Sequence, residues 1–374
     1  MGFSPIPHVR IALIGLGRRG MKTLERYAFI PDASIVYIAD IDQNKLNEAN
    51  AKLEASNRPK AKIACGADAW KSVCLEDDID LVYICTDWDT HAEISIYAMK
   101  AGKHVAVEVP AARTIEECWS LVKTSEETGK HCFMTENCCY DNFALSTIEM
   151  YKQGLLGDIT HCEGAYIHKI ENLSASWMEK SCSSHGGNAY PTHGIGPIAQ
   201  LLKLQGNDKM DYLVSLTSSM KCKKNEESKV NTTLIHTQKG VSILLQLDVT
   251  TNRPYNRLQT ICGTKGFVQK YPLPTIQWRD EETATLGEEA EKRAYTFLNG
   301  ESAQIWLKGK EMGVPNEMNY TMDYRLIKSL INGDPLDMDV YDAATWSCIA
   351  ELSKKSAENG SIPIKIPDFT VNKK

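Results

Sequence analysis

The stretch that decides the fold is IALIGLGRRG, residues 11–20, followed by Asp40 at the end of SIVYIAD. A β-branched apolar run leads directly into Gly15, Gly17 and Gly20, which have the spacing G-x-G-x-x-G and open a helix. Glycine at the first positions permits a tight turn and lets backbone N–H groups approach an anion at the positive end of the helix. The stretch therefore predicts a strand–turn–helix unit that holds a pyrophosphate.

Asp40 ends the second predicted strand, where its carboxylate can accept hydrogen bonds from both hydroxyls of a ribose. A carboxylate there repels a 2′-phosphate, so the pattern favours NAD over NADP. Arg18 and Arg19, between the glycines, weaken that preference slightly. The pattern combines a strand, a glycine turn, a helix and a second strand that ends in an acid, and together these predict dinucleotide binding. The alternative is a glycine turn that only allows close packing.

The rest of the first third alternates short apolar runs with amphipathic segments. The runs are HVRIALIG, SIVYIAD, DLVYICT, HVAVEV and HCFMTE, and helix-length patterns such as DQNKLNEANAKLEA and TIEECWSLVKTSEETG separate them. This alternation predicts right-handed β–α–β crossovers and a parallel sheet buried on both faces. We therefore expect an α/β protein in which residues 1–135 form a doubly wound, Rossmann-type, NAD-binding domain.

Residues 136–374 have a different texture. DYLVSLTSSM, KVNTTLIHTQ, VSILLQLDVT and RLQTICGT are longer and alternating, with TQKG as a turn between two of them. They predict an antiparallel meander with an open face, within an α+β domain for substrate binding and oligomerisation. MDYRLIKSLING, closed by Gly333, and DVYDAATWSCIAELSKKSAENG predict amphipathic helices. We expect these terminal helices to pack back toward the first domain.

Composition argues against several classes of function. A net charge of -6 and a pI of about 5.9 give no basic field, so we expect no nucleic-acid partner. The 12 cysteines include no C-x-x-C and no histidine at zinc spacing, so we expect reduced, buried thiols and no metal site. No apolar run approaches the length of about 20 residues that spans a bilayer, and MGFSPIP lacks the features of a signal. The sequence as written predicts a cytoplasmic protein without a membrane partner, and a longer, exported precursor stays open.

Polar residues follow the later predicted strands, where open α/β sheets bind ligands. Those expected to contact the cofactor are Thr86, Trp88 and His91 after DLVYIC, Glu108 at the end of HVAVEV, and Asn137 after HCFMTE. Pro110 restrains the chain so that Glu108 can be held under the nicotinamide ribose. For His91, a solvated position in the first turn of a helix is an equal alternative.

Two sets of segments resemble known families. GLGRRG, and EVP after HVAV, resemble the glucose–fructose oxidoreductase and inositol dehydrogenase (Gfo/Idh/MocA) superfamily of NAD(P) enzymes, whose dehydrogenases have a proton-transferring lysine in E-K-P. The closer likeness, over nearly the whole chain, is to glycoside hydrolase family 109, the NAD-dependent α-N-acetylgalactosaminidases. The matching segments are AMKAGKHVAVEVPAA, TIEECW, TENCCY, GDITHCEGAY, NAYPTHGIGP, TNRPYN and PLDMDVYDAATWS. Val109 stands at the position of the dehydrogenase lysine. The H-G-G-M-D of family 109 appears here as NYTMD, so its histidine is absent, and Asn319 and Tyr320 stand nearby.

The resemblance implies a redox route to hydrolysis, in which C3 of the sugar is oxidised, the C2 proton and the anomeric substituent leave, water adds, and C3 is reduced again. Such a cycle needs bases and an acid within hydrogen-bond reach. The resemblance places His193 and Tyr190 at the sugar's hydroxyl end, beside the nicotinamide, and makes Tyr140 and Tyr255 candidates for C2–H abstraction or leaving-group protonation. Because His193 precedes a predicted helix, we expect the positive helix start to lower its pKa and keep it a neutral base near pH 7.

The residues by themselves leave plainer readings open. The side chains of Tyr190 and His193, at positions i and i+3, can point toward the same small molecule. His193 can equally be a helix-capping core residue, Tyr140 can close a buried edge, and Tyr255 can be an ordinary turn tyrosine.

Two other functions also stay open: a sugar or polyol dehydrogenase that releases NADH, and an inactive NAD-binding sensor or scaffold, which the missing lysine and histidine motivate. The open sheet predicts a homodimer or homotetramer. The exact sugar and its aglycone are not fixed by the sequence.

Overall fold

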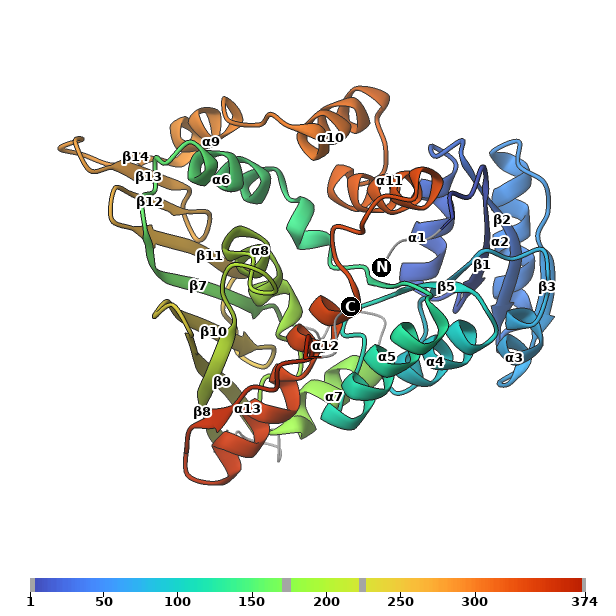
Figure 1. Cartoon of the computed structure of the whole chain (residues 1–374), viewed down its shortest axis with the longest axis horizontal. Helices are drawn as coiled ribbons and strands as arrows, with labels where there is room; N and C mark the ends of the chain where they lie inside the picture. The colour runs from blue at the N-terminus through green and yellow to red at the C-terminus, as the bar shows by residue number, and fades with distance from the viewer. Residues whose placement is uncertain (1–3, 170–175, 222–226, 372–374) are drawn as a thin grey trace. The chain divides into compact units, whose positions relative to one another are not determined.

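The computed structural model describes residues 4–169, 176–221 and 227–371 (Figure 1). It divides into two compact units. The first unit contains Met1–Thr135, Ile305–Ala344 and Phe369–Lys374, and the second contains Glu136–Gln304 and Thr345–Asp368. The chain therefore enters the first unit three times.

The first unit is built on a six-stranded parallel sheet in the order β3-β2-β1-β4-β5-β6, which confirms the predicted doubly wound fold. Its strands are β1 (Val9–Ile14), β2 (Ala33–Asp40), β3 (Lys62–Cys65), β4 (Leu81–Ile84), β5 (His104–Val107) and β6 (Cys132–Met134). Its helices are α1 (Arg18–Tyr27), α2 (Gln43–Ala55), α3 (Ala69–Cys74), α4 (His91–Lys100), α5 (Ile115–Thr128) and α11 (Glu317–Asn332). Helices α10 (Glu301–Met312) and α12 (Val340–Ser347) each span a division between the two units.

Local signals explain where these elements begin and end. Strands β4 and β5 are buried along their whole length, as expected for a sheet with helices on both faces. Thr114 and Glu117 form a capping box at the start of α5. Gly333, with φ of 73°, ends α11 as the sequence predicted. Strand β3 escaped prediction because its four residues are mostly exposed and form no apolar run.

A buried ion pair fastens α11 to the sheet of the first unit. Arg26 of α1 donates from Nε to Oδ2 of Asp323 at 2.9 Å, and the hydroxyl of Tyr83 donates to Oδ1 at 3.0 Å. The side chains of Arg26 and Asp323 are almost entirely removed from solvent. Each charge is therefore tolerated only because the other one is present.

Replacing Asp323 with alanine should lower the free energy of unfolding by about 3–5 kcal/mol, because Arg26 would stay buried without a counter-charge. Chemical denaturation monitored by circular dichroism measures the change. Lys123→Ala, which removes only an exposed pair with Glu127, is the control and should leave stability nearly unchanged. Equal losses in the two variants would contradict the importance assigned to the buried pair.

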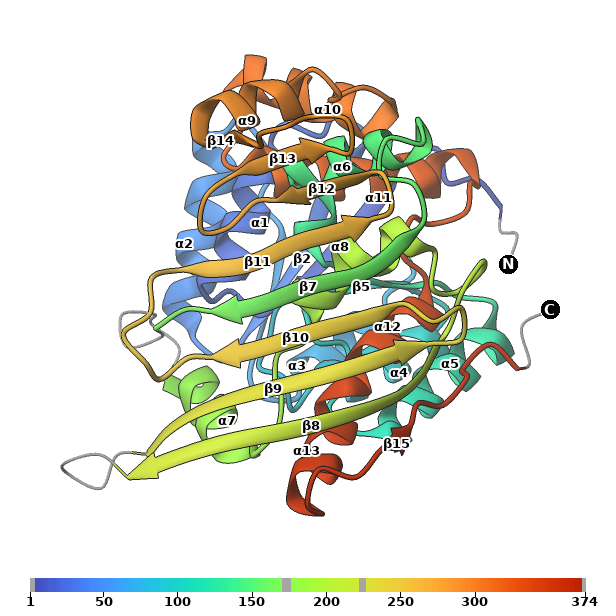
Figure 2. The ribbon, with the colours of Figure 1, turned by 90° about the vertical axis from the view of Figure 1, so that its left-hand side faces the viewer.

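The second unit contains a nine-stranded, mostly antiparallel sheet in the order β14-β13-β12-β11-β7-β10-β9-β8-β15 (Figure 2). Its strands are β7 (Ile159–Ile167), β8 (Met210–Lys221), β9 (Glu227–Thr237), β10 (Ser242–Asp248), β11 (Asn256–Gly263), β12 (Gly266–Gln269), β13 (Thr275–Trp278), β14 (Thr285–Leu286) and β15 (Ile364–Lys365). Its helical segments are η1 (Asn137–Tyr140), α6 (Asn142–Lys152), α7 (Ser176–His185), α8 (Thr192–Leu202), α9 (Gly287–Tyr295) and α13 (Ile349–Glu358).

The sequence predicted an uninterrupted meander, and that detail is wrong. Strands β8, β9 and β10 are antiparallel neighbours, with the expected turn between β9 and β10. Strand β7 then lies between β10 and β11, parallel to the first and antiparallel to the second. The connection of residues 249–255 carries the chain past β7 instead of folding back as a hairpin, and alternation along a strand does not reveal this. The helix expected over DVYDAATWSCIAELSKKSAENG is also divided, into α12 and α13 on either side of Cys348.

The two faces of this sheet differ in their cover within the second unit. Helix α8 packs against β7 and β11, and α13 packs against β8 (Figure 2). Leu213 of β8 and Ile235 of β9 are buried on the face toward these helices, whereas Leu216 and Leu234 of the same strands are exposed. The alternation that predicted an open face is thus present. None of the helices in the described ranges has the length and apolar character needed to cross a membrane.

Candidate active site

The predicted site residues fall into two groups. The glycine turn, Asp40, Thr86, Trp88, His91 and Glu108 belong to the first unit, whereas Asn137, Tyr140, Tyr190, His193 and Tyr255 belong to the second.

The three glycines of the first unit have different physical roles. Gly15 has φ of 86°, and a Cβ there would lie 2.7 Å from the carbonyl of Cys85. A Cβ on Gly20 would lie 1.9 Å from the carbonyl oxygen of Gly15. Gly17, in contrast, has no atom of the described chain within 4 Å of its Cβ position. Gly17 directly precedes α1, whose first turn has no side-chain cap and no acidic residue. The backbone N–H groups of this turn therefore face open space, where they can donate to a pyrophosphate.

Asp40 links the glycine turn to the end of β2. Its Oδ2 accepts the N–H of Leu16 at 2.6 Å, and its Oδ1 accepts the N–H of Asp42 at 2.9 Å. Because a carboxylate oxygen can accept more than one hydrogen bond, Asp40 keeps acceptor capacity for ribose hydroxyls. The turn and this carboxylate together fit an adenine dinucleotide.

Glu108 is held by Arg19 of the glycine turn. Its Oε1 accepts from Nε of Arg19 at 3.0 Å and from Nη2 at 2.8 Å. The same Nη2 lies 3.5 Å from Oδ1 of Asn319, in the NYTMD segment of α11. Arg19 therefore links the end of β5 to α11, while its neighbour Arg18 is exposed.

His91 is not solvated, so that alternative is wrong. The ring is buried, with Nδ1 2.8 Å from the carbonyl oxygen of Pro110 and Nε2 3.2 Å from that of Thr86. Burial lowers the pKa of His91, which keeps the ring neutral at pH 7. His91 thus orients the loops that follow β4 and β5. Trp88, in the loop that follows β4, is buried. Thr86 in the same loop is half-buried, and its Oγ1 accepts a hydrogen bond from Oγ1 of Thr90 at 2.7 Å.

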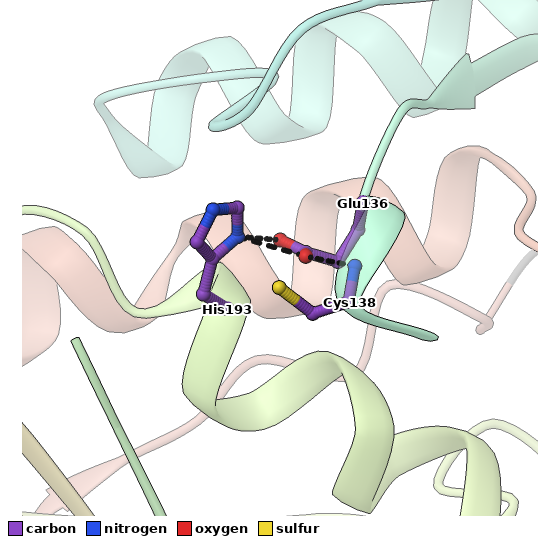
Figure 3. A group of neighbouring side chains, drawn as sticks. All are labelled: Glu136, Cys138 and His193. Carbon is purple, nitrogen blue, oxygen red and sulfur yellow. Dashed lines mark hydrogen bonds and ion pairs between the residues drawn. The ribbon is translucent and has the colours of Figure 1, made fainter. Parts of the chain in front are cut away.

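In the second unit, Glu136, His193 and Tyr190 form a chain of hydrogen bonds. Glu136 precedes η1, and His193 lies in the first turn of α8, which begins at Thr192. Both carboxylate oxygens of Glu136 lie 2.8 Å from Nδ1 of His193 (Figure 3). On the other side of the ring, Nε2 lies 3.2 Å from the hydroxyl oxygen of Tyr190. The side chains of Tyr190 and His193 therefore lie within hydrogen-bond distance of each other, and their shared role toward a small molecule stays a prediction.

The protonation expected for His193 is corrected by this geometry. Burial alone would lower the pKa of His193, but the acidic side chains of Cys138 and Glu136 outweigh it and raise that pKa to about 10. A helix start carries only about half a charge, whereas Glu136 places a full carboxylate in contact with the ring. The pKa of Glu136 is lowered, although burial opposes this, because His193 lies beside it. The geometry therefore favours a carboxylate paired with an imidazolium.

Close backbone approaches make room for this pair. A Cβ on Gly196 of α8 would lie 2.7 Å from Cγ of Glu136. A Cβ on Gly164 of β7 would lie 2.2 Å from the carbonyl oxygen of Gly194. Glycine at these positions therefore lets the first turn of α8 rest on β7 and reach Glu136.

An aromatic cluster adjoins the pair and includes Tyr255. The ring of Tyr166, from β7, lies 4.8 Å from that of Tyr190 and 5.5 Å from that of His193. The hydroxyl of Tyr166 lies 3.1 Å from Nδ1 of His168, whose ring lies 5.1 Å from that of Tyr255. Tyr255 is 45% exposed, and partial burial raises its pKa. The sequence reading missed Tyr166 and His168, although their i, i+2 spacing in a predicted segment was a usable signal.

The other two predicted residues of this unit lie in η1. Tyr140 is only 3% exposed, and Asn137 is buried with its Oδ1 3.5 Å from Sγ of Cys138. Of the two tyrosines left as alternatives, Tyr255 is the one that reaches the surface of the unit. The choice between them stays a prediction.

A second set of buried charges holds the segment that carries Tyr255. Asp141 accepts from Nη2 of Arg257 at 2.9 Å and from Nζ of Lys270 at 2.6 Å. Burial works against ionisation of Asp141, but the two cations lower its pKa to about 2. Leu258 and Gln259 both have φ of 57°, at the place where the register of β11 against β7 shifts. This strained bulge turns Arg257 toward Asp141 and fixes Tyr255 two residues before it.

Within the described ranges, Glu136, Cys138 and His193 are the one group of three potential metal-ligating side chains, with ligand atoms within 4.8 Å of one another (Figure 3). The carboxylate and Nδ1 already satisfy each other at hydrogen-bond distance. We therefore assign an ion pair to this group rather than a metal site.

The fold and these two groups define an NAD-dependent enzyme with a Gfo/Idh-type architecture. The model of the oxidoreductase family with an NAD-binding Rossmann fold matches residues 9–136, and that of the glycosyl hydrolase 109 C-terminal domain matches residues 171–374. The chain belongs to glycoside hydrolase family 109.

Relatives cover nearly the whole chain. An alpha-N-acetylgalactosaminidase of Bacteroides fragilis is 48% identical and spans 99% of this chain and 94% of its own length. A glycosyl hydrolase family 109 protein of Phocaeicola vulgatus is 46% identical, with 98% and 95% covered. A levoglucosan dehydrogenase in complex with NADH and L-sorbose has a TM-score of 0.75 at 19% identity, covers 97% of this chain and 100% of its own, and so shares the fold.

Gly17→Ala should weaken NAD binding by at least about tenfold without loss of stability, because its methyl group would occupy space that only the cofactor needs. Gly20→Ala is the contrasting variant and should destabilise the protein, since its Cβ would collide with Gly15. Calorimetric titration with NAD and thermal denaturation separate the two effects. Unchanged NAD affinity in Gly17→Ala would contradict the assigned cofactor position.

Proposed function

We propose that this protein hydrolyses α-linked N-acetylgalactosaminides, or closely related glycosides, by transient oxidation at C3, elimination across C1 and C2, addition of water and re-reduction. NAD, when bound, would supply the redox chemistry by taking up a hydride and giving it back, so the cycle would consume no cofactor. The observation that carries the proposal is the paired Tyr190 and His193 in a family 109 chain whose dehydrogenase lysine is replaced by the apolar Val109. The identity to the Bacteroides fragilis enzyme supports the choice of sugar.

In this proposal the chain's own residues manage protons. Tyr190 and His193 serve the sugar's hydroxyl end, where a proton leaves and later returns. Tyr255 is favoured for C2–H abstraction or leaving-group protonation, because its exposed ring adjoins the aromatic cluster. Tyr140 stays the second candidate for that step.

An aryl α-N-acetylgalactosaminide should be cleaved with no net NADH formed, and the released sugar should carry solvent deuterium at C2. Chromogenic assay, absorbance of NADH and mass spectrometry in D₂O measure these three quantities. His193→Ala should lower the rate by at least about 10²-fold while NAD stays bound, because the proton-handling pair is lost. Stoichiometric NADH with free sugars would instead identify a dehydrogenase, and cleavage without exchange would exclude the elimination route.

We also propose that the protein self-associates through the outer face of β8 and β9. Leu216 and Met220 of β8 and Leu234 of β9 are 63%, 71% and 49% exposed, and Tyr212 stacks on His236 across the same pair of strands. Thr232 is paired with Leu216 and Val214 with Leu234, so these apolar side chains project from one face. Several exposed apolar side chains on one face of a sheet are typical of an interface between identical chains.

The double variant Leu216→Asp, Leu234→Asp should convert an oligomer to a monomer, because buried unpaired carboxylates oppose association. Light scattering of the native protein and the variant measures the change. Leu75→Asp, at an exposed apolar residue of the first unit, is the matched control and should leave the mass unchanged. A native protein that is monomeric at tens of micromolar would refute the interface.

A further inference from the structure

A cation beside the residue that takes the hydroxyl proton aids the oxidation of an alcohol. In this chain the position of the dehydrogenases' lysine is occupied by Val109, which is apolar and 3% exposed. His193 is in contact with Tyr190 through Nε2, and its Nδ1 lies 2.8 Å from both carboxylate oxygens of Glu136, a contact that favours the imidazolium. The structure therefore contains a cation next to the phenol in a place that the sequence did not indicate.

We propose that Glu136 is a positioning residue that keeps His193 as an imidazolium, so that Tyr190, stabilised as a phenolate by this cation, accepts the proton of the sugar's C3 hydroxyl. This inference rests on the proposed function. It reverses the roles expected from the sequence, because His193 holds its protons throughout and Tyr190 is the base.

Three contacts explain why Glu136 keeps its charge. Its side chain is 0% exposed, and both oxygens face Nδ1 of His193 at 2.8 Å. The backbone N–H of Cys138 donates to Oε1 at 3.0 Å. Were His193 to lose its second proton, a buried carboxylate would remain without a counter-charge, and this is strongly unfavourable. The proton on the ring is therefore retained.

The orientation of the ring follows from the same contacts. With Nδ1–H donated to Glu136, the other N–H points from Nε2 to the hydroxyl oxygen of Tyr190 at 3.2 Å. A cation at this distance favours a negative oxygen on Tyr190. The other titratable or charged groups that face the ring are Cys138 from η1, Tyr166 from β7 and Arg257 from β11, which lines the same small pocket. Among these groups, Glu136 is the carboxylate bonded to the ring.

The proton balance of the step is closed. The O–H bond of the C3 hydroxyl breaks and an O–H bond forms on Tyr190, while the C–H bond at C3 breaks and its hydrogen leaves with two electrons as a hydride, which the NAD required by the proposed function would take up. When the C3 alcohol is restored, Tyr190 returns the same proton and is again a phenolate. Glu136 and His193 exchange no proton in the cycle, so no external acid, base or oxidant is consumed.

The first test measures protonation directly, in the NAD-bound protein. ¹⁵N NMR of labelled histidines from pH 6 to 11 should show both nitrogens of His193 protonated at pH 8, with loss only near pH 10. His193→Gln identifies its signals. Glu136→Gln keeps a hydrogen-bond acceptor but no charge, so the ring should be neutral at pH 8. A native His193 that is neutral at pH 8 overturns the inference, whether or not any glycoside is cleaved.

The second test measures rate on the aryl glycoside. Glu136→Gln should lower kcat by about 10²-fold with little change in KM, and should move the alkaline limb of the pH–rate profile downward. Asp208→Asn is the matched control and should have a native profile. Asp208 is a buried carboxylate of the same unit, and its Oδ1 accepts from the backbone N–H groups of Lys209 and Lys239. A native rate and profile in Glu136→Gln overturn the inference.

The two tests also separate this inference from the proposed function. The native protein could cleave no glycoside and still have both ring nitrogens of His193 protonated at pH 8, with one of these protons lost in Glu136→Gln. This result would refute the proposed function and support the role of Glu136 toward His193. A folding defect in Glu136→Gln leaves the titration of native His193 as the deciding result.

Discussion

A single buried carboxylate constrains the second unit more than any other group. Glu136 has no exposed surface and lies in contact with His193, so the unit must bring η1, the first turn of α8 and β7 together closely enough to pair them. Gly164, Gly194 and Gly196 stand where any side chain would keep these elements apart. The buried charge of Glu136 therefore requires the close packing that brings His193 to it, because an unpaired carboxylate at this depth would be strongly destabilising.

Buried charge is compensated in the same way elsewhere in each unit. Asp323 is neutralised by Arg26 and bonded by Tyr83 in the first unit, and Asp141 is neutralised by Arg257 and Lys270 in the second. The first arrangement holds α11 against the sheet. The second fixes the bulged start of β11, and with it the tyrosine of TNRPYN. Paired charges require particular geometries, so they specify where each element sits in addition to any stability they add.

Much of the first unit could be predicted because its signals are local. The spacing of Gly15, Gly17 and Gly20 after an apolar run dictates the turn, and Gly333 dictates the end of α11 through its positive φ. The second unit was less predictable, since alternation marks a strand but not its neighbours, and β7 was therefore not expected between β10 and β11. The pairing of Tyr190 with His193 was predicted from a spacing of three residues, which fixes their separation in any helical turn.

The sequence by itself determined the doubly wound NAD-binding domain, the open sheet and the YPTH pair, because each of these depends on residues close together along the chain. Only the tertiary structure decided the protonation of His193. Its partner Glu136 is 57 residues away in sequence, and the ring of Tyr166 adjoins His193 from β7. Electrostatic interaction depends on distance in space, and a contact of 2.8 Å across a buried interface outweighs the partial charge of the helix end on which the sequence-based expectation relied.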